Sequence, residues 1–194
     1  MDDVAAKAAV SKQTVYKHFS DKEQLFAHIV LATTDAVDEV VRLVASSLGE
    51  TTDLERDLGA LARTLLVTLM QPALLRLRRL VIASADLFPE VGRAWYERGF
   101  ERVLAALAER FADLTRRGLL DVDDPMLAAH HFSGSLLWIS VNRAMFTGDE
   151  HRDSEDALAR YAEEAVRAFL SAYAPSLRGH AYKPGPRSTS KSHG

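Results

Sequence analysis

The sequence predicts an all-α protein, and three observations support this class. Apolar residues recur every three or four positions along most of the 194 residues, which is the spacing of one helix face. Ser, Thr, Asp or Pro precedes these stretches and Gly or Pro follows them, as at helix ends. The sequence has neither the alternating pattern of β-strands nor an internal repeat. We therefore expect helices packed on helices, in one or two domains.

The first two expected helices lie at the start of the chain. Residues 2–9 predict a short helix, and Ala9 with Val10 predicts a tight turn. Ser11 is a suitable N-cap for a second helix that ends near Phe19. Small residues at the turn let two helices cross closely, as in a helix-turn-helix. A plain amphipathic helical hairpin has the same spacing, so the pattern alone leaves both interpretations open.

The second helix has an apolar face and a basic face. At about 100° per residue, Val15 and Phe19 share one face. Gln13 and Lys17 lie on the opposite face, which carries no acidic residue. The remaining side chains, Thr14, Tyr16 and His18, flank that face. A basic outward face favours a nucleic-acid partner.

A third helix begins directly after this one. Ser20 and Glu23 have the spacing of a capping box, and Lys22 falls in the first turn. Lysines usually avoid that end of a helix, because the helix dipole favours anions there. A phosphate group at this position would meet both the lysine and the open N–H groups.

These motifs closely resemble the helix-turn-helix of TetR/AcrR-type transcriptional regulators. The resemblance rests on Val4-Ala5, Ala8-Ala9-Val10-Ser11, Thr14-Val15-Tyr16, His18-Phe19, Asp21-Lys22-Glu23 and Leu25. It implies binding to a double-stranded DNA operator, with the second helix in the major groove. The usual turn glycine of that family is replaced by Ala9 in this chain.

Family members carry a first helix, and the start of the next, ahead of this point. We therefore expect the sequence to lack that helix, which would cover Val4, Val15 and Phe19. Their exposure would cost roughly 1.5–3 kcal/mol each, and we expect weak operator binding by the chain as given. The alternative function is a dimeric small-molecule-binding module without DNA binding.

Helix-end residues divide the rest of the chain into further helices. The expected spans are 21–47, 52–70, 72–86, 89–118, 124–147 and about 153–173. Thr52 and Glu55 form a second capping box, and Pro72, Pro89 and Pro125 suit first helical positions. Helix-stopping residues follow several of these spans: Gly49, Gly118, Gly148 and Pro175. Three arginines, Arg76, Arg78 and Arg79, could bind an anion, but we favour a solvated polar face.

Composition excludes several classes of protein. Without cysteine, the chain forms no disulfide, thiolate metal site or cysteine nucleophile. The net charge of the chain is −3. The sequence shows neither a signal peptide nor a membrane span of ~20 apolar residues. We therefore expect a cytoplasmic protein without membrane contact. An enzyme is the rival class, but no nucleophile elbow, H-E-x-x-H or phosphate-binding Gly loop occurs. We therefore expect no catalytic residue, cofactor or metal.

The C-terminal part shows a second resemblance. Residues 75–83, 88–91 and 132–136 resemble the AefR-like branch of the TetR family. This implies a ligand-binding domain that dimerises through its last two long helices. Gly134 permits close helix contact, and Leu158, Tyr161 and Phe169 offer a partner stripe. A monomeric core would use the same faces.

We expect a head at 1–30, a ligand and dimerisation domain at 31–175, and a disordered polar tail at 176–194.

Large or polar side chains of the middle helices are candidates for a ligand cavity. They are Trp95, Tyr96, Phe100, His130, Trp138, Asn142 and Phe146. Ordinary core packing is the alternative for each. His130 and His131 point to different helix faces, which favours a core or interface role over metal binding.

The resemblance implies a homodimeric, ligand-responsive regulator, most simply a repressor released from its operator by a small apolar effector. The expected DNA contacts are Ser11, Lys12, Gln13, Thr14, Tyr16, Lys17, His18 and Lys22. Gln13 and Lys17 point outward and are the expected base contacts. Ser11, Tyr16 and Lys22 are expected to hold phosphates. For Lys12 only the resemblance supports a base contact.

Overall fold

A computed structural model describes residues 1–32, 35–148 and 153–175. Its helices are α1 Asp2–Lys7, α2 Lys12–His18, α3 Lys22–Ala32, α4 Asp35–Ser47, α5 Leu54–Leu69, α6 Pro72–Ala83, α7 Pro89–Trp95, the π-helical η1 Tyr96–Glu101, α8 Arg102–Arg116, α9 Pro125–Thr147 and α10 Glu155–Tyr173. The all-α prediction is confirmed, with no strand in the described ranges. Residues 33–34 of the expected 21–47 helix and the expected tail at 176–194 lie outside the described residues.

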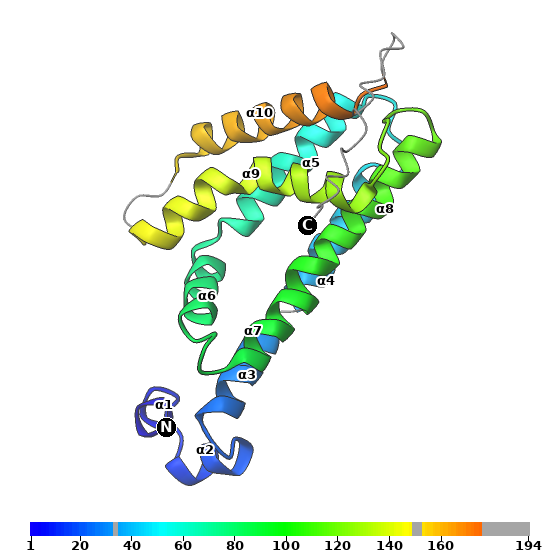
Figure 1. Ribbon diagram of the computed structural model, residues 1–194. Helices are drawn as coiled ribbons and strands as arrows, with labels where there is room; N and C mark the ends of the chain where they lie inside the picture. The colour runs from blue at the N-terminus through cyan, green and yellow to red at the C-terminus, as the bar shows by residue number, and fades with distance from the viewer. Residues whose placement is uncertain (33–34, 149–152, 176–194) are drawn as a thin grey trace, which may run out of the picture.

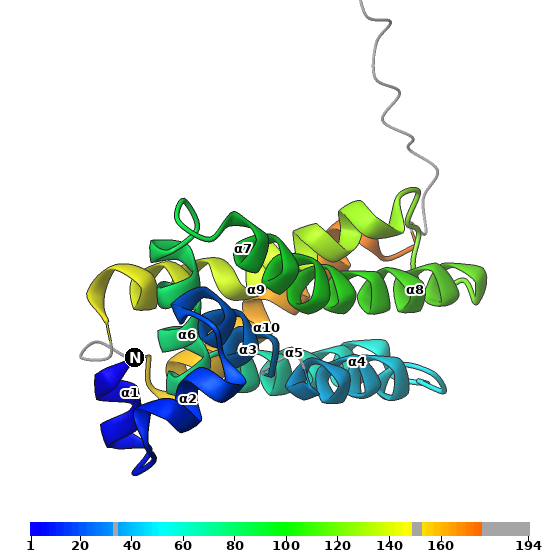
Figure 2. The same ribbon diagram turned by 90° about the horizontal axis from the view of Figure 1, so that it is seen from below.

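The molecule has a small head joined to a larger body (Figures 1 and 2). The head consists of α1, α2 and the first turns of α3. In the body, α8 packs between α4 and α9, while α10 packs on α5 and α9. Helices α6 and α7 lie between the head and the far end of the body. The body therefore presents α6 and α7 toward the head.

Aromatic side chains fill the centre of the body. The Phe111 ring of α8 lies 5.8 Å from Phe132 of α9 and 4.7 Å from Phe169 of α10, measured between ring centres. All three side chains are buried. Beside this core, the Arg117 guanidinium donates hydrogen bonds of 2.7–3.1 Å to the carbonyls of Leu48, Gly49 and Thr51. These contacts fix α8, α9, α10 and the end of α4 as one rigid support.

A second, smaller core joins the head to the body. Val30 of α3, Val81 of α6 and Val91 of α7 are buried together. Next to them, the Phe26 ring of α3 lies 5.5 Å from the Phe88 ring that precedes α7. Helix α3 thus carries the head at its start and packs on α6 and α7 toward its end.

At both expected capping boxes the N-cap is the next residue along the chain. Asp21, rather than Ser20, accepts a 2.8 Å hydrogen bond from the Gln24 N–H, and Asp53, rather than Thr52, accepts one of 3.1 Å from the Arg56 N–H. A carboxylate accepts hydrogen bonds more strongly than a hydroxyl and is favoured by the helix dipole. The Asp that follows each Ser or Thr therefore becomes the cap.

The expected helix over 89–118 is also divided. Its middle, η1, forms one π-helical turn between α7 and α8, although Trp95 and Arg102 on either side keep ordinary helical backbone angles. Apolar spacing predicts that a segment is helical but not which turn widens. π-turns inside α-helices are frequent at functional sites.

Within the described ranges, no single helix has both the length and the apolar character of a membrane span. Helices α5 and α6 reach that threshold only as a pair, and they meet at a bend of 64°.

Candidate nucleic-acid interface and ligand cavity

The turn between α1 and α2 has an unusual backbone. Ala9 adopts a φ of +53°, in the left-handed region that favours glycine. The Ser11 hydroxyl then caps α2, accepting a 3.0 Å hydrogen bond from the Thr14 N–H and lying 2.8 Å from the Thr14 hydroxyl. The expected tight turn and N-cap are both present.

The inner face of α2 is better covered than the sequence suggested. Val15 is only 6% exposed, so its expected exposure was wrong, because α1 packs against α2 and buries Val15 and Ala5. The Phe19 ring is half-buried and lies 5.3 Å from the His28 ring of α3. Val4 is 39% exposed, as expected.

The outward face of α2 is open and polar. Ser11, Gln13, Thr14, Tyr16 and Lys17 together line one shallow surface hollow. Beside it, His18 is exposed. Neither Gln13 nor Lys17 forms a hydrogen bond or ion pair with any described residue. Both side chains are therefore available to a partner molecule.

Lys12 occupies a different position from its neighbours. Its ammonium lies 2.9 and 3.0 Å from the two carboxylate oxygens of Asp2 and 6.0 Å from the centre of the Tyr16 ring. The hydrogen bond between them raises the pKa of Lys12 and lowers the pKa of Asp2. An exposed pair of this kind contributes little stability. It does orient Lys12 toward α1 rather than along the outward face of α2.

Lys22 lies in the first turn of α3, as expected. Its side chain is exposed and has no hydrogen-bond or ion-pair partner in the described part of the chain. The Asp21 beside it accepts hydrogen bonds from the Gln24 N–H and the Ser20 hydroxyl, which lower the pKa of that carboxyl. The turn thus offers one uncommitted lysine at its surface.

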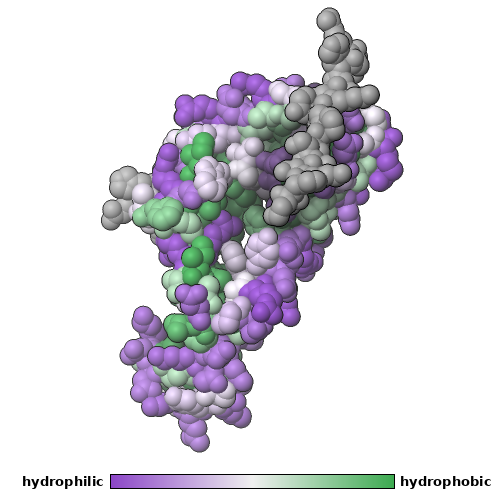
Figure 3. All heavy atoms as spheres, viewed as in Figure 1, coloured by the Kyte–Doolittle hydropathy of each residue, from purple (hydrophilic) through white to green (hydrophobic). Residues whose placement is uncertain are grey.

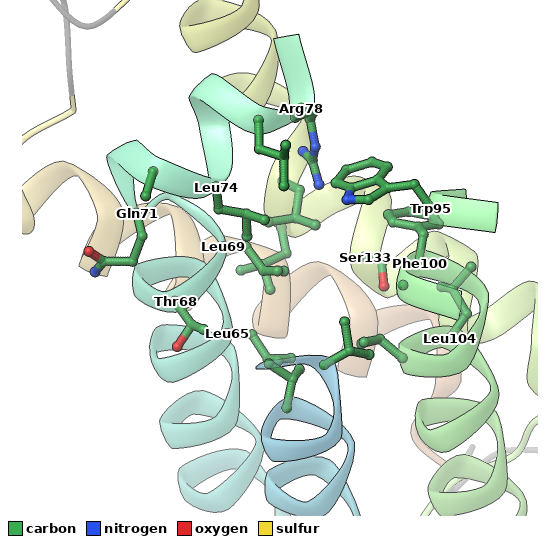
Figure 4. Close-up of a pocket in the computed structure, with 18 of the residues that line it drawn as sticks. Leu65, Thr68, Leu69, Gln71, Leu74, Arg78, Trp95, Phe100, Leu104 and Ser133 are labelled. Carbon is green, nitrogen blue, oxygen red and sulfur yellow. The ribbon is translucent and has the colours of Figure 1, made fainter. Parts of the chain in front are cut away.

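A cavity of about 540 Å³ lies within the body (Figure 4). Its wall is mostly leucine, valine and aromatic side chains drawn from α3 to α9. Its lining consists of Ile29, Val37, Val40, Leu65, Thr68, Leu69, Gln71, Ala73, Leu74, Leu77, Arg78, Trp95, Gly99, Phe100, Val103, Leu104, Leu107, Ser133, Leu136 and Leu137. The size and apolar lining suit a small organic molecule.

Some of the seven residues expected to bind a ligand line the cavity, and the others do not. Trp95 and Phe100 line the cavity. Tyr96, His130, Trp138, Asn142 and Phe146 lie outside its lining. Tyr96 stacks on Phe100 with ring centres 5.7 Å apart, and His130 is exposed on α9. Helical spacing does not distinguish the two sides of α9, and His130, Trp138 and Phe146 are exposed there.

Sequence reasoning missed the most polar group of the cavity. Arg78 lines it and is half-buried, so the solvated face expected for the arginines does not hold for this one. Figure 4 shows its guanidinium beside the Trp95 indole, and the distance to the ring centre is 5.6 Å. The signal was present in the sequence, because Arg78 occupies a position on the apolar stripe of Leu74, Leu77 and Val81.

The outer face of α9 is apolar. Trp138 is 70% exposed and Phe146 is 86% exposed. They lie two helical turns apart, and between them Asn142 donates a 2.9 Å hydrogen bond to the Trp138 carbonyl. Gly134, one turn earlier, has open space where a side chain would begin. A second hydrophobic surface lies over α6 (Figure 3), where Ile82 is 59% exposed.

Two family models match this chain, each over a different part of it. Residues 1–29 match the family described as bacterial regulatory proteins, tetR family, and residues 56–175 match the AefR-like transcriptional repressor, C-terminal domain. No curated protein matches the chain significantly.

Several solved structures are similar over most of the chain. A Mesorhizobium loti MAFF303099 protein assigned to the TetR-family regulators is 51% identical, with a TM-score of 0.82, over 89% of this chain and 85% of that one. The Flavonoid-responsive Regulator FrrA is 27% identical, with a TM-score of 0.70, over 90% and 86%. A TetR-family regulator of Pseudomonas syringae pv. tomato DC3000 is 26% identical, with a TM-score of 0.70, over 90% and 85%. The chain therefore belongs to the TetR family, whose members are transcriptional regulators and not enzymes, and carries an AefR-like C-terminal domain.

Proposed function

We propose that this TetR-family regulator is a homodimeric repressor that a small, mainly apolar effector releases from its operator. The observation that carries the proposal is the double role of α3. This helix presents Lys22 at its start, and near its end it contributes Ile29 to the wall of the cavity. A ligand in the cavity therefore contacts the same helix that positions the head.

In the DNA complex, α2 enters the major groove with Gln13 and Lys17 toward the base edges. A glutamine amide suits adenine and a lysine suits guanine. Ser11, Tyr16 and Lys22 contact phosphates and set the register, while Thr14 and His18 flank the base contacts. Lys12 keeps its pairing with Asp2 and acts on DNA mainly by orienting α2 against α1.

The effector occupies the cavity between Trp95 and Phe100 on one side and the leucines of α5 and α6 on the other. A flat aromatic molecule suits this lining, because aromatic rings stack favourably on one another. The similarity to a regulator named as flavonoid-responsive supports the same class of ligand. The regulator acts in the cytoplasm, where its operator DNA lies.

Release follows from movement of α3. A ligand that displaces Ile29 or Trp95 shifts the small core of Val30, Val81 and Val91, and with it the head. In a dimer this changes the separation of the two heads, so that they no longer fit successive grooves. The two subunits meet through the exposed face of α9 together with α10.

Paired substitutions in the natural full-length protein test the DNA contacts. Lys22→Ala should weaken binding to every DNA sequence and reduce the slope of log K against log salt by about 0.9 for each lost phosphate contact. Gln13→Ala should instead reduce the preference for the operator and leave the salt slope unchanged. The operator is first located by titrating fluorescent fragments from upstream of the protein's own gene.

The outcome separates the two candidate functions. An unchanged salt slope in Lys22→Ala would remove the phosphate role from this lysine. If no fragment binds above the non-specific level, the chain is the alternative, a ligand-binding dimer without DNA binding.

A further inference from the structure

We propose that the effector is an amphipathic anion, with an apolar or aromatic body in the leucine-lined part of the cavity and one acidic group, such as a carboxylate, on Arg78. This inference rests on the proposed function and names the chemical class of its effector.

The charge of the cavity wall points to an anion. Among the lining residues that the structure describes, Arg78 is the one charged side chain, and none is an Asp or Glu. The other polar lining residues, Thr68, Gln71 and Ser133, are neutral. A ligand that fills this cavity therefore meets a single positive charge in apolar surroundings.

Arg78 has no acceptor among the described residues, unlike Arg79 and Arg102. Its guanidinium stacks over Trp95 and forms no hydrogen bond or ion pair with any described residue. By contrast, Arg79 donates a 2.9 Å hydrogen bond to the Ala144 carbonyl, and Arg102 pairs with Asp38 at 2.6 Å. The fold thus supplies an acceptor to Arg79 and to Arg102, whereas no described residue supplies one to Arg78.

A half-buried guanidinium without an acceptor is energetically unfavourable. Burial lowers the pKa of Arg78 from its ordinary value, since water is partly excluded and no anion replaces it. A carboxylate would supply two acceptor oxygens in the plane of the guanidinium, a geometry that arginine binds strongly. The adjacent Trp95 indole, which already covers one face of Arg78, leaves its N–H edges for the ligand.

Two dyes with the same ring system test this assignment. 1-Anilinonaphthalene-8-sulfonate carries one anionic group, and N-phenyl-1-naphthylamine is the same molecule without it. Both fluoresce more strongly in apolar surroundings. Each dye is titrated into the natural full-length protein and into the variants Arg78→Met, Arg78→Gln and Arg78→Lys. Arg76→Met, on the same helix but outside the cavity lining, is the matched control.

We expect Arg78→Met and Arg78→Gln to lose about tenfold or more in affinity for the sulfonate dye, as for a lost charge-assisted hydrogen bond. The neutral dye should bind all variants with affinity within about twofold, which also reports that they are folded. Arg78→Lys should retain much of the anion preference, and Arg76→Met all of it.

Two results would overturn the inference in different ways. If Arg78→Met and Arg78→Gln weaken binding of the two dyes equally, or weaken binding of neither, then Arg78 only supports Trp95 and the effector need not be an anion. Leu104→Trp, which fills part of the cavity, should weaken both dyes. If neither dye responds to this variant, or neither binds, then the cavity itself is not a ligand site and the proposed function fails with the inference.

Discussion

Ala9 is the residue that sets the crossing of the two head helices. It is the one non-glycine residue with a positive φ in the described ranges. An L-residue in this conformation costs roughly 1–2 kcal/mol, because its Cβ approaches the following carbonyl oxygen. The chain tolerates this strain to keep α1 against the buried Val15.

We predict that Ala9→Gly stabilises the head by about 1 kcal/mol, since glycine adopts this φ without the steric penalty. Amide hydrogen exchange of α1 and α2 should slow accordingly. Ala8→Gly is the matched control, because Ala8 has an ordinary helical φ of −82°. It should destabilise by about 0.5–1 kcal/mol. Faster exchange in both variants would show that the turn is not strained.

Single residues also show how far the sequence predicts local structure. The expected cap Ser11 is confirmed, and Asp124 and Ser154 begin α9 and α10 in the same way, since each of the three accepts a hydrogen bond from the N–H three residues later. At Ser20 and Thr52 two good caps stand side by side, because an Asp follows each, and the sequence alone does not show which of the two begins the helix. The sequence does place Arg78 on the apolar face of its helix, but it does not show the cavity that this face borders, because several helices form the cavity wall together.

At the scale of elements, the contact of α3 with α6 and α7 is the narrow connection between head and body. The small core there is formed by three buried valines and the adjoining Phe26 and Phe88 rings. A connection this small moves more easily than the large aromatic core of α8, α9 and α10. It is therefore the part of the fold best suited to transmit a signal.

We predict that Phe88→Ala loosens α3 selectively. The half-buried ring should contribute about 1–3 kcal/mol, less than the 3–5 kcal/mol of a fully buried one. Amides of α3 and α7 should then exchange faster, while those of α5, α9 and α10 remain unchanged. Leu87→Ala is the control, because Leu87 is 75% exposed and its loss should change stability by less than about 0.5 kcal/mol. Uniform acceleration throughout the body would contradict a separate connecting core.

Helical periodicity predicts most elements correctly, since each helix is specified by its own spacing and ends. It does not predict the π-turn η1, because the same apolar spacing suits an ordinary α-helical turn. It also does not predict the cavity lining, because the wall combines residues from α3 to α9 that are far apart in the sequence.

At the scale of the whole molecule, α9 has two unlike faces. Its inner face is buried in the body, and its outer face exposes Trp138 and Phe146. Both aromatic residues were expected in a ligand cavity, and the structure places them outside its lining. Large exposed aromatic residues in a row indicate an interaction site. A second copy of the chain fits this face, because a two-fold axis would bring two identical apolar stripes together.

We predict that Trp138→Glu converts the proposed dimer to a monomer. A buried, unpaired carboxylate at the centre of the interface is strongly unfavourable. The molar mass measured by light scattering should fall from about twice the chain mass to the 21.4 kDa of one chain. Operator affinity should fall far more than non-specific affinity, because two linked heads bind two half-sites together.

Ile82→Glu is the matched control for this experiment. Ile82 is exposed on α6, so the substitution adds the same charge to the other apolar surface. If Ile82→Glu dissociates the dimer and Trp138→Glu does not, then the subunits meet through α6. An α6 interface would place the dimer contact next to Arg78 and the cavity, and effector binding would then act on subunit separation directly rather than through α3.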